Sequence, residues 1–368
     1  MGYSRIKVPA PAAYHITSRT KNDDFLLEDD EDKRSLLDII RRAAAFAGVA
    51  VMSHAILDNH FHLLVHIPAR QEVGDAELER RVRILWGEEK AEAAFSRWKY
   101  REANGRAAFA EKERDAFRRR MYDISAFVKT VKEMFAHAHH RRHGTCGSVW
   151  GASRFKSAAV SSDFKTLATV SAYIDLNAVR ARIARHPKNY KWCALGAAKK
   201  GDALALEGIK VLARDAERQT ENESALDAYM RFVDDTKTKK KSVDRLIAGG
   251  EGNASARASG RGGSDMRRGG YVRKTLDSAD LTRLGAKGVE RWLAASEIQP
   301  ESASEMWTRR FGNFAMGGII GPLAAVITAR EELVRGAYMH TRWQPSVVEG
   351  VYSYIHERNV KARKRNAS

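Results

Sequence analysis

The run LDNHFHLLVHIP at residues 57–68 limits the possible folds of this chain more than any other stretch. Bulky apolar residues alternate with histidines, and successive side chains of a β-strand point to opposite faces. Phe61, Leu63 and Val65 therefore share one face of a strand, whereas His60 and His62 share the other. We expect a strand over 59–67 with one face packed in a core and a second face that carries imidazoles.

The segments around this run alternate between strand-like and helix-like patterns. Strand patterns cover residues 12–20, 49–57, 59–67 and 154–160. Helical spacing covers residues 33–46, residues 124–140, and a long helix that Ser162 or Asp163 caps and that continues through Ile183. The order strand, helix, strand, strand, helix, strand predicts an α+β fold, a ferredoxin-like antiparallel sheet with helices on one face.

The composition of the successive segments predicts the domain organisation. Residues 1–200 hold the predicted sheet and a charged helical insertion at about 72–120, and a mainly helical C-terminal extension follows. This extension begins with a helical part at 201–248. A flexible Gly/Ser/Arg linker follows at 249–270, and a helical basic region comes next, at 271–368. The most apolar run, residues 314–327, is too short and too interrupted by Gly and Pro to span a bilayer.

The charge balance predicts a polyanionic partner. Lys and Arg number 64 against 46 Asp and Glu, a formal net charge of +18. Nucleic acid is the usual partner of so basic a protein, with an anionic membrane surface or simple solubility as the alternatives. The two cysteines, Cys146 and Cys193, exclude a disulfide framework and a thiolate zinc site, and they suit a reducing cytoplasm.

Two imidazoles on one strand face can converge on a divalent cation. His60 and His62 have this spacing, although ordinary surface histidines of a half-exposed strand would show it too. His137 and His139 have the same spacing in a helical context, where their rings point roughly 200° apart and cannot chelate one ion together. With the arginines that follow, the second pair predicts a patch that faces phosphate.

A second informative stretch is SAYIDLNAVRAR at residues 171–182. Tyr173 and Asn177 are four residues apart, so on a helix they lie on one face. An amide oxygen can bind a hard cation and a tyrosine oxygen can act as a nucleophile, but a buried tyrosine near an asparagine is also common in cores.

Taken together, these motifs resemble the REP-associated tyrosine transposases of bacteria, which are single-tyrosine HUH transposases (His, hydrophobic residue, His). Five motifs occur in the family's order within residues 5–195: YHITSR, LDNHFHLLV, GSVW…RFKS, YIDLNAVRA and HPKNYKW. Two departures are Ala178, where the family often has Pro, and a loop from Trp150 to Arg154 that is one residue longer than usual.

The resemblance implies an HUH nuclease fold and an enzyme that nicks and rejoins DNA. His60, His62 and Asn177 would bind Mg²⁺ or Mn²⁺, and Tyr173 would be the catalytic nucleophile that forms a 5′-phosphotyrosine link. The partner would be single-stranded or hairpin DNA of palindromic repeats, with the protein acting as a monomer or homodimer. Candidate DNA contacts are Arg19, His139, Arg141, Arg142, Arg154, Lys156, Arg180 and Arg182.

Three other functions remain open at this stage. The chain could be a catalytically inactive or domesticated protein that binds hairpin DNA or RNA on the same fold. It could be an RNA-binding module, although such a sheet exposes aromatic side chains for base stacking rather than imidazoles. It could also be another HUH nuclease, such as a replication initiator.

Overall fold

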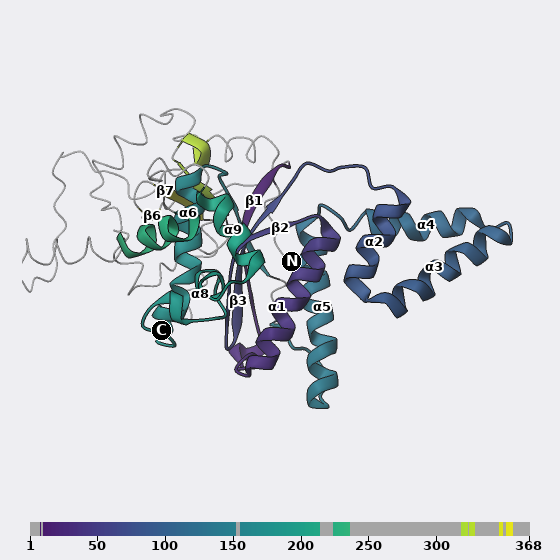
Figure 1. The fold of residues 1–368 in the computed structure, drawn as a ribbon, viewed down its shortest axis with the longest axis horizontal. Helices are drawn as coiled ribbons and strands as arrows, with labels where there is room; N and C mark the ends of the chain where they lie inside the picture. Colours follow the sequence, from purple (N-terminus) through teal and green to yellow (C-terminus); the bar gives the residue numbers. More distant parts are fainter. Residues whose placement is uncertain are drawn as a thin grey trace, which may run out of the picture.

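The computed structural model describes residue 8 and residues 10–151, 155–213, 224–235, 318–322, 324–327, 346–348 and 351–355. Figure 1 shows a central sheet with a layer of helices on each side and a helical arm that extends away from it.

The central sheet confirms the predicted ferredoxin-like arrangement. Its first four strands are β1 (Ala12–Arg19), β2 (Ala50–Leu57), β3 (His60–Ile67) and β4 (Lys156–Val160). They lie in the order β2-β3-β1-β4, and every neighbouring pair among them is antiparallel. The strand that comes first in the chain is therefore central, between β3 and β4.

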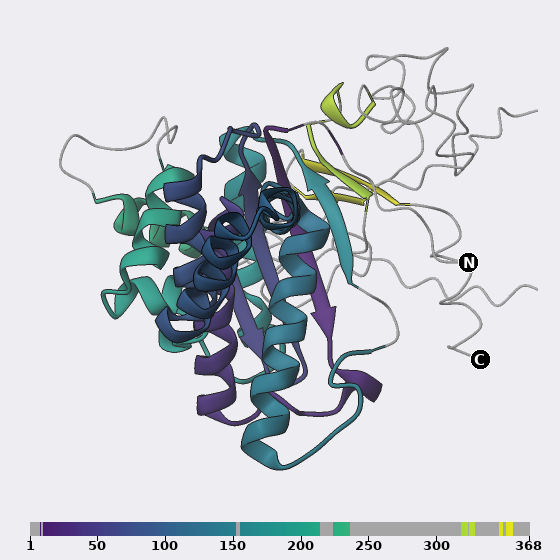
Figure 2. The ribbon, with the colours of Figure 1, turned by 90° about the vertical axis from the view of Figure 1, so that its right-hand side faces the viewer.

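Two helices cover the apolar face of this sheet, α1 (Asp30–Ala47) and α5 (Ile124–His143), as Figure 2 shows. Asp29 caps α1 by accepting from the Glu31 amide, and Gly48 ends it with a left-handed φ of 67°. On this face the Trp150 ring lies 5.6 Å from Phe61 and 5.5 Å from Phe135, measured between ring centroids. The alternation of β3 thus directs its apolar side chains into the core as predicted.

Between β3 and α5 the chain forms the arm, from α2 (Asp75–Trp86), α3 (Glu88–Ala103) and α4 (Ala107–Arg118). The arm has its own small core, in which Trp98 lies 5.2 Å from Phe95 and 5.8 Å from Phe117. Arg114 and Arg118 join its helices through ion pairs to surrounding carboxylates.

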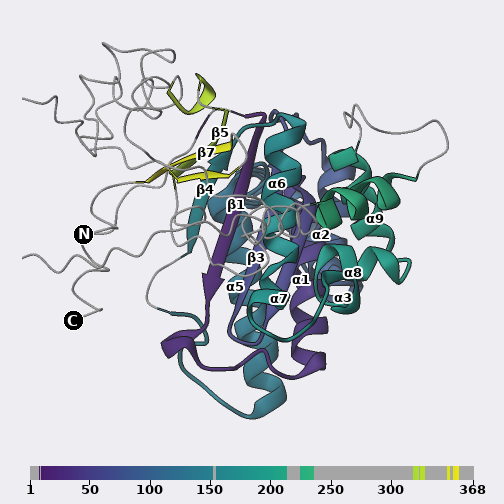
Figure 3. The same cartoon turned by 90° about the vertical axis from the view of Figure 1, so that its left-hand side faces the viewer.

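Helices also cover the second face of the sheet, where α6 (Phe164–Asp175) packs against β2 and β3. Figure 3 shows α6 on the side of the sheet away from α1 and α5. On this side α7 (Asn177–Arg180), α8 (Ala194–Lys199) and α9 (Ala203–Ala213) also contact β2. The remaining described helices are η1 (Lys21–Asp23), directly after β1, η2 (Pro187–Asn189), a helix over 225–235 and a short one over 324–327. The helix predicted through Ile183 is interrupted at Leu176 and ends at Arg180.

Three strands late in the chain extend the sheet, and the sequence analysis missed them. They are β5 (Gly318–Gly321), β6 (Ser346–Val348) and β7 (Val351–Ile355), and β5 runs parallel to β4. A buried strand as short as β5 shows no alternation by which to recognise it. The predicted linker at 249–270 lies outside the described residues. Within the described part of the chain, no helix has both the length and the apolar character needed to cross a membrane.

Candidate active site

The register of the sheet gathers polar side chains on the face beneath α6. Thr17 of β1 lies opposite His62 of β3, and Arg19 lies opposite His60. Directly paired residues point to the same face, so this end of the sheet carries both predicted ligands. The His60 and His62 rings lie 5.0 Å apart between centroids, in an edge-to-face arrangement.

Tyr173 reaches these histidines from α6. Asp163 caps the helix by accepting from the Thr166 amide, and apolar residues along α6 then direct it onto the sheet. The Tyr173 ring is 1% exposed and its centroid lies 6.3 Å from that of His62. The structure therefore brings the predicted nucleophile and both predicted histidine ligands to one site.

Hydrogen bonds orient the two imidazoles. His60 Nδ1 lies 2.7 Å from Asn59 Oδ1, so this nitrogen donates and the lone pair of the ring is on Nε2. His62 Nδ1 lies 3.0 Å from both Thr17 Oγ1 and His15 Nε2. Metal-binding histidines commonly have one ring nitrogen held in this way by a neighbour, so the pair fits a divalent cation bound through the Nε2 atoms.

His15 is a residue of this site that the sequence analysis missed. It is 1% exposed, it stacks on His62 with ring centroids 5.2 Å apart, and its ring edge meets Tyr173 at 5.9 Å. Burial lowers the pKa of His15 to about 3, so the ring is neutral at ordinary pH. The motif YHITSR could have indicated that His15 belongs to the site, because strand alternation puts residues 15, 17 and 19 on one face.

Asn177 lies one turn beyond Tyr173, at the start of α7. Its Nδ2 atom donates to the Tyr173 and Ile174 carbonyl oxygens, both at 3.1 Å. These bonds hold the side chain against α6 rather than against the histidines, and they leave Oδ1 as the amide atom suited to a cation. Its role as a third ligand remains a prediction.

A buried polar network anchors α6 to the helix over 225–235. The Tyr229 hydroxyl lies 2.7 Å from Ser171 Oγ and donates to Asp175 Oδ2 at 2.7 Å. Asp175 Oδ1 also accepts from the Leu195 amide at 3.1 Å. Burial raises the pKa of Asp175 to about 6. The position of the Tyr173 helix thus depends on residues that follow the predicted first domain.

The predicted DNA contacts divide between the two sides of the sheet. Arg180 lies beside the predicted nucleophile, with its guanidinium carbon 4.4 Å from the Tyr173 ring centroid and a hydrogen bond to the Tyr173 carbonyl. Arg19 pairs with Asp23 at 2.9 Å near the His60 end, and Lys156 and Arg182 are exposed. Arg154 lies outside the described residues.

His139, Arg141 and Arg142 lie on α5, away from Tyr173. Burial lowers the pKa of His139, which is 7% exposed. Arg142 pairs with three carboxylates near the start of α1, whereas Arg141 is exposed. The structure does not bring this predicted patch together with the predicted nucleophile.

A comparison with protein-family models agrees with the motifs. Residues 10–76 match the family model described as "Transposase IS200 like". A solved structure titled "Structure of the REP associates tyrosine transposase bound to a REP hairpin" is 13% identical, with a TM-score of 0.35, and the alignment covers 54% of this chain and 84% of that chain. No curated protein matches. Over residues 10–76, which include both histidines of the HFH motif, this chain is similar to the IS200-like transposases, as its motifs predicted.

Proposed function

We propose that this protein is a transposase that cleaves and rejoins single-stranded DNA at hairpin or palindromic repeats, through a covalent 5′-phosphotyrosine intermediate. One observation carries the proposal. Tyr173, from a helix late in the domain, lies edge-on to His62, whose ring in turn lies 5.0 Å from His60. Only the fold brings Tyr173 to the two histidines, since it lies more than 100 residues after them in the sequence.

The proposed metal ligands are His60, His62 and Asn177. Two imidazoles and an amide oxygen suit Mg²⁺ or Mn²⁺ when waters and a phosphate oxygen complete the shell. When bound, such an ion polarises the scissile phosphate and offsets the charge that develops in the transition state. Asn59, Thr17 and His15 would hold the two imidazoles in the orientation that this requires.

The reaction itself would use the Tyr173 oxygen. It attacks the phosphorus atom, the bond from phosphorus to the 3′ oxygen breaks, and the phenol proton passes overall to that oxygen. The products are a 5′-phosphotyrosine and a free 3′-OH, and attack by another 3′-OH reverses the step without an external energy source. Arg180, whose guanidinium lies over the phenol ring, would bind phosphate as the strand enters.

Access to the site requires a local opening. Tyr173 and His62 are each 1% exposed, and α6 packs directly on the sheet above them. We infer that a DNA strand reaches the phosphate-binding position only after α6 or α7 shifts. The anchoring network at Asp175 makes α7 the less firmly held of the two.

The experiment uses labelled single-stranded hairpins, Mg²⁺ or Mn²⁺, and denaturing gels that detect a covalent protein–DNA adduct. Tyr173→Phe removes only the hydroxyl, so we expect no adduct and no cleavage, with hairpin affinity within about twofold of the original, since the removed group contributes little to phosphate binding. Tyr100→Phe is the matched control, because Tyr100 is 66% exposed on α3 in the arm. Cleavage by Tyr173→Phe at the control rate would refute the assigned role.

The closed state of the site also favours a second candidate, a hairpin-binding protein without catalytic activity. This candidate predicts that the unmodified protein binds hairpins but forms no adduct with either metal. The same gels therefore separate the two functions.

A further inference from the structure

We propose that Asp32, His139 and His143 form a second metal site, specific for a transition-metal ion of the Zn²⁺ type, which fastens the start of α1 to the end of α5. This site is separate from the proposed catalytic centre. It lies in the helix layer on the opposite side of the sheet from Tyr173.

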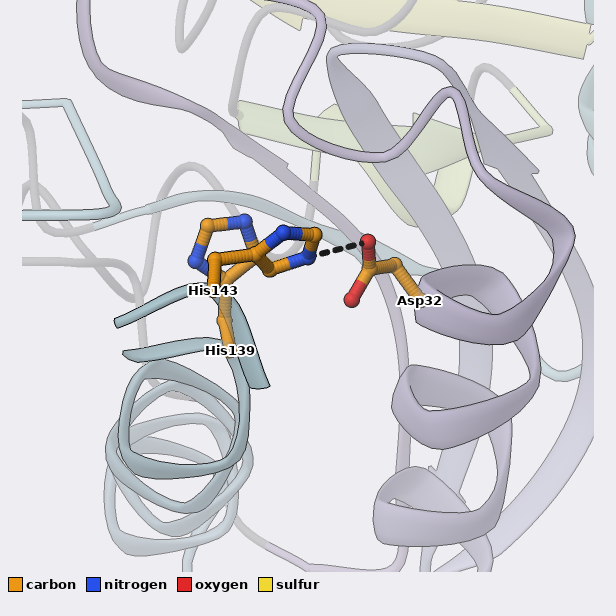
Figure 4. Close-up of side chains that lie close together, drawn as sticks. All are labelled: Asp32, His139 and His143. Carbon is orange, nitrogen blue, oxygen red and sulfur yellow. Dashed lines mark hydrogen bonds and ion pairs between the residues drawn. The ribbon is translucent and has the colours of Figure 1, made fainter. Parts of the chain in front are cut away.

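The geometry brings three ligand atoms into one small volume (Figure 4). His139 and His143 are one helical turn apart on α5 and face Asp32 on α1. One ring nitrogen of each histidine and one carboxylate oxygen of Asp32 all lie within 4.8 Å of one another. His143 Nε2 lies 2.9 Å from Asp32 Oδ2, close to the separation of about 3 Å that two ligands of one zinc ion have.

Burial marks this cluster as more than a surface ion pair. Asp32 is 3% exposed and His139 is 7% exposed, and both line a hollow that opens to solvent beside His143. His139 Nδ1 is buried and, among the described residues, has no hydrogen-bond partner. An unpaired buried nitrogen is costly, and a metal ion that took this nitrogen as its ligand would supply the partner that it lacks.

The charges around the cluster favour a dication. Arg142 contacts Asp29, Glu31 and Asp32, so three carboxylates face one guanidinium and negative charge remains in excess. If the Asp32 carboxylate binds a metal ion instead, Arg142 still pairs with Asp29 and Glu31. Two imidazoles and one carboxylate are typical ligands of zinc, and they leave the remaining positions to water.

The consequence is a metal cross-link between two helices that are otherwise joined by packing and by the ion pairs of Arg142 and His143. The start of α1 and the end of α5 lie at the same end of the domain, so an ion there would stabilise the helix layer that covers the apolar face of the sheet. We expect binding to raise the thermal stability of the whole protein without changing its cleavage chemistry.

The test uses full-length, tag-free protein that has been stripped of metal. Zn²⁺ at a free concentration about 100 times its Kd should raise the Tm by about 5–10 °C. Co²⁺, which gives a visible absorption band when bound by nitrogen ligands in a tetrahedral site, serves as the probe of the site. Both effects should survive in the His60→Ala/His62→Ala double variant, which removes the proposed catalytic ligands.

Variants of the cluster provide the decisive comparison. His139→Ala and Asp32→Asn should weaken Co²⁺ binding by at least about tenfold, since even indirect partners of a metal site contribute that much. His143→Ala should do the same and is expected to fold, because the side chain is 36% exposed. His137→Ala is the matched control, an exposed histidine on the same helix. If the band is absent from the unmodified protein, or is lost in the His60→Ala/His62→Ala variant and kept in His139→Ala, the proposal is wrong.

Discussion

The two faces of the central sheet use histidine in different ways. Beneath α6, His15, His60 and His62 lie against neutral groups, namely Thr17, Asn59 and the Tyr173 ring. On the other side, His143 pairs with the Asp32 carboxylate at the end of a helix, and His54 is buried on β2.

The difference teaches that the surroundings of an imidazole, and not its spacing in the sequence, decide what it can do. Neutral hydrogen-bond partners hold a ring in place without cancelling the charge of a metal ion or a phosphate. A carboxylate partner instead builds a site of fixed negative charge. The two His-x-His pairs of this chain have the same spacing, yet only the pair on β3 has its rings side by side.

The largest expected effect concerns the face that carries the proposed catalytic site. His60→Ala and His62→Ala should each lower cleavage of a labelled hairpin by at least about 100-fold, because each removes a proposed ligand of the ion that would polarise the phosphate. His66→Ala, on the same strand and the same face, should stay within about threefold. Equal losses in all three variants would show that the strand is needed only for folding. The proposed difference between the histidines of the two faces would then be wrong.

A second prediction tests the buried histidine on the other face. Burial lowers the pKa of His54 to about 4, with the Arg41 charge acting in the same direction. The unfolded chain takes up a proton near pH 6.5 and the folded protein does not, so stability is lost as the pH falls through this window. Between about pH 7.5 and pH 5 this residue should cost about 2 kcal/mol.

Urea unfolding at the two pH values measures this loss. His54→Gln should lose about 2 kcal/mol less than the unmodified protein on acidification, whereas His137→Gln, at an exposed position, should behave like the unmodified protein. An unchanged pH dependence in His54→Gln would mean that His54 is protonated in the folded state.

The smallest expected effect concerns DNA binding. Arg182 follows α7 near the proposed site, whereas Arg141 lies on α5, and both are exposed. If DNA binds the α6 side, Arg182→Ala should weaken hairpin binding by about two- to fivefold and lower the slope of log affinity against log salt by about 0.7–0.9. Arg141→Ala should change neither quantity. A comparable loss in Arg141→Ala would show that the hairpin also contacts the other side of the protein.

Much of the first domain was predictable because its signals are local. Alternation identified β3, helical spacing identified α1 and α5, and the order of these elements left few topologies to consider. The prediction of a helical region over 271–368 was wrong at β5, β6 and β7, since short strands owe their conformation to the neighbours with which they pair rather than to their own pattern. The part of His15 in the site was missed for a similar reason, because the stacking of His15 on His62 depends on the pairing of β1 with β3.

By itself the sequence determined that a β-strand would present His60 and His62 on one face and that Tyr173 and Asn177 would lie one turn apart, because each follows from the backbone repeat of one short segment. The tertiary structure alone decided that α6 lies on the imidazole face of the sheet, that Asp32 meets His139 and His143, and that Arg142 turns to carboxylates. These contacts join segments far apart in the chain. They depend on which faces of the helices and of the sheet pack against one another, and this packing cannot be read from a local sequence pattern.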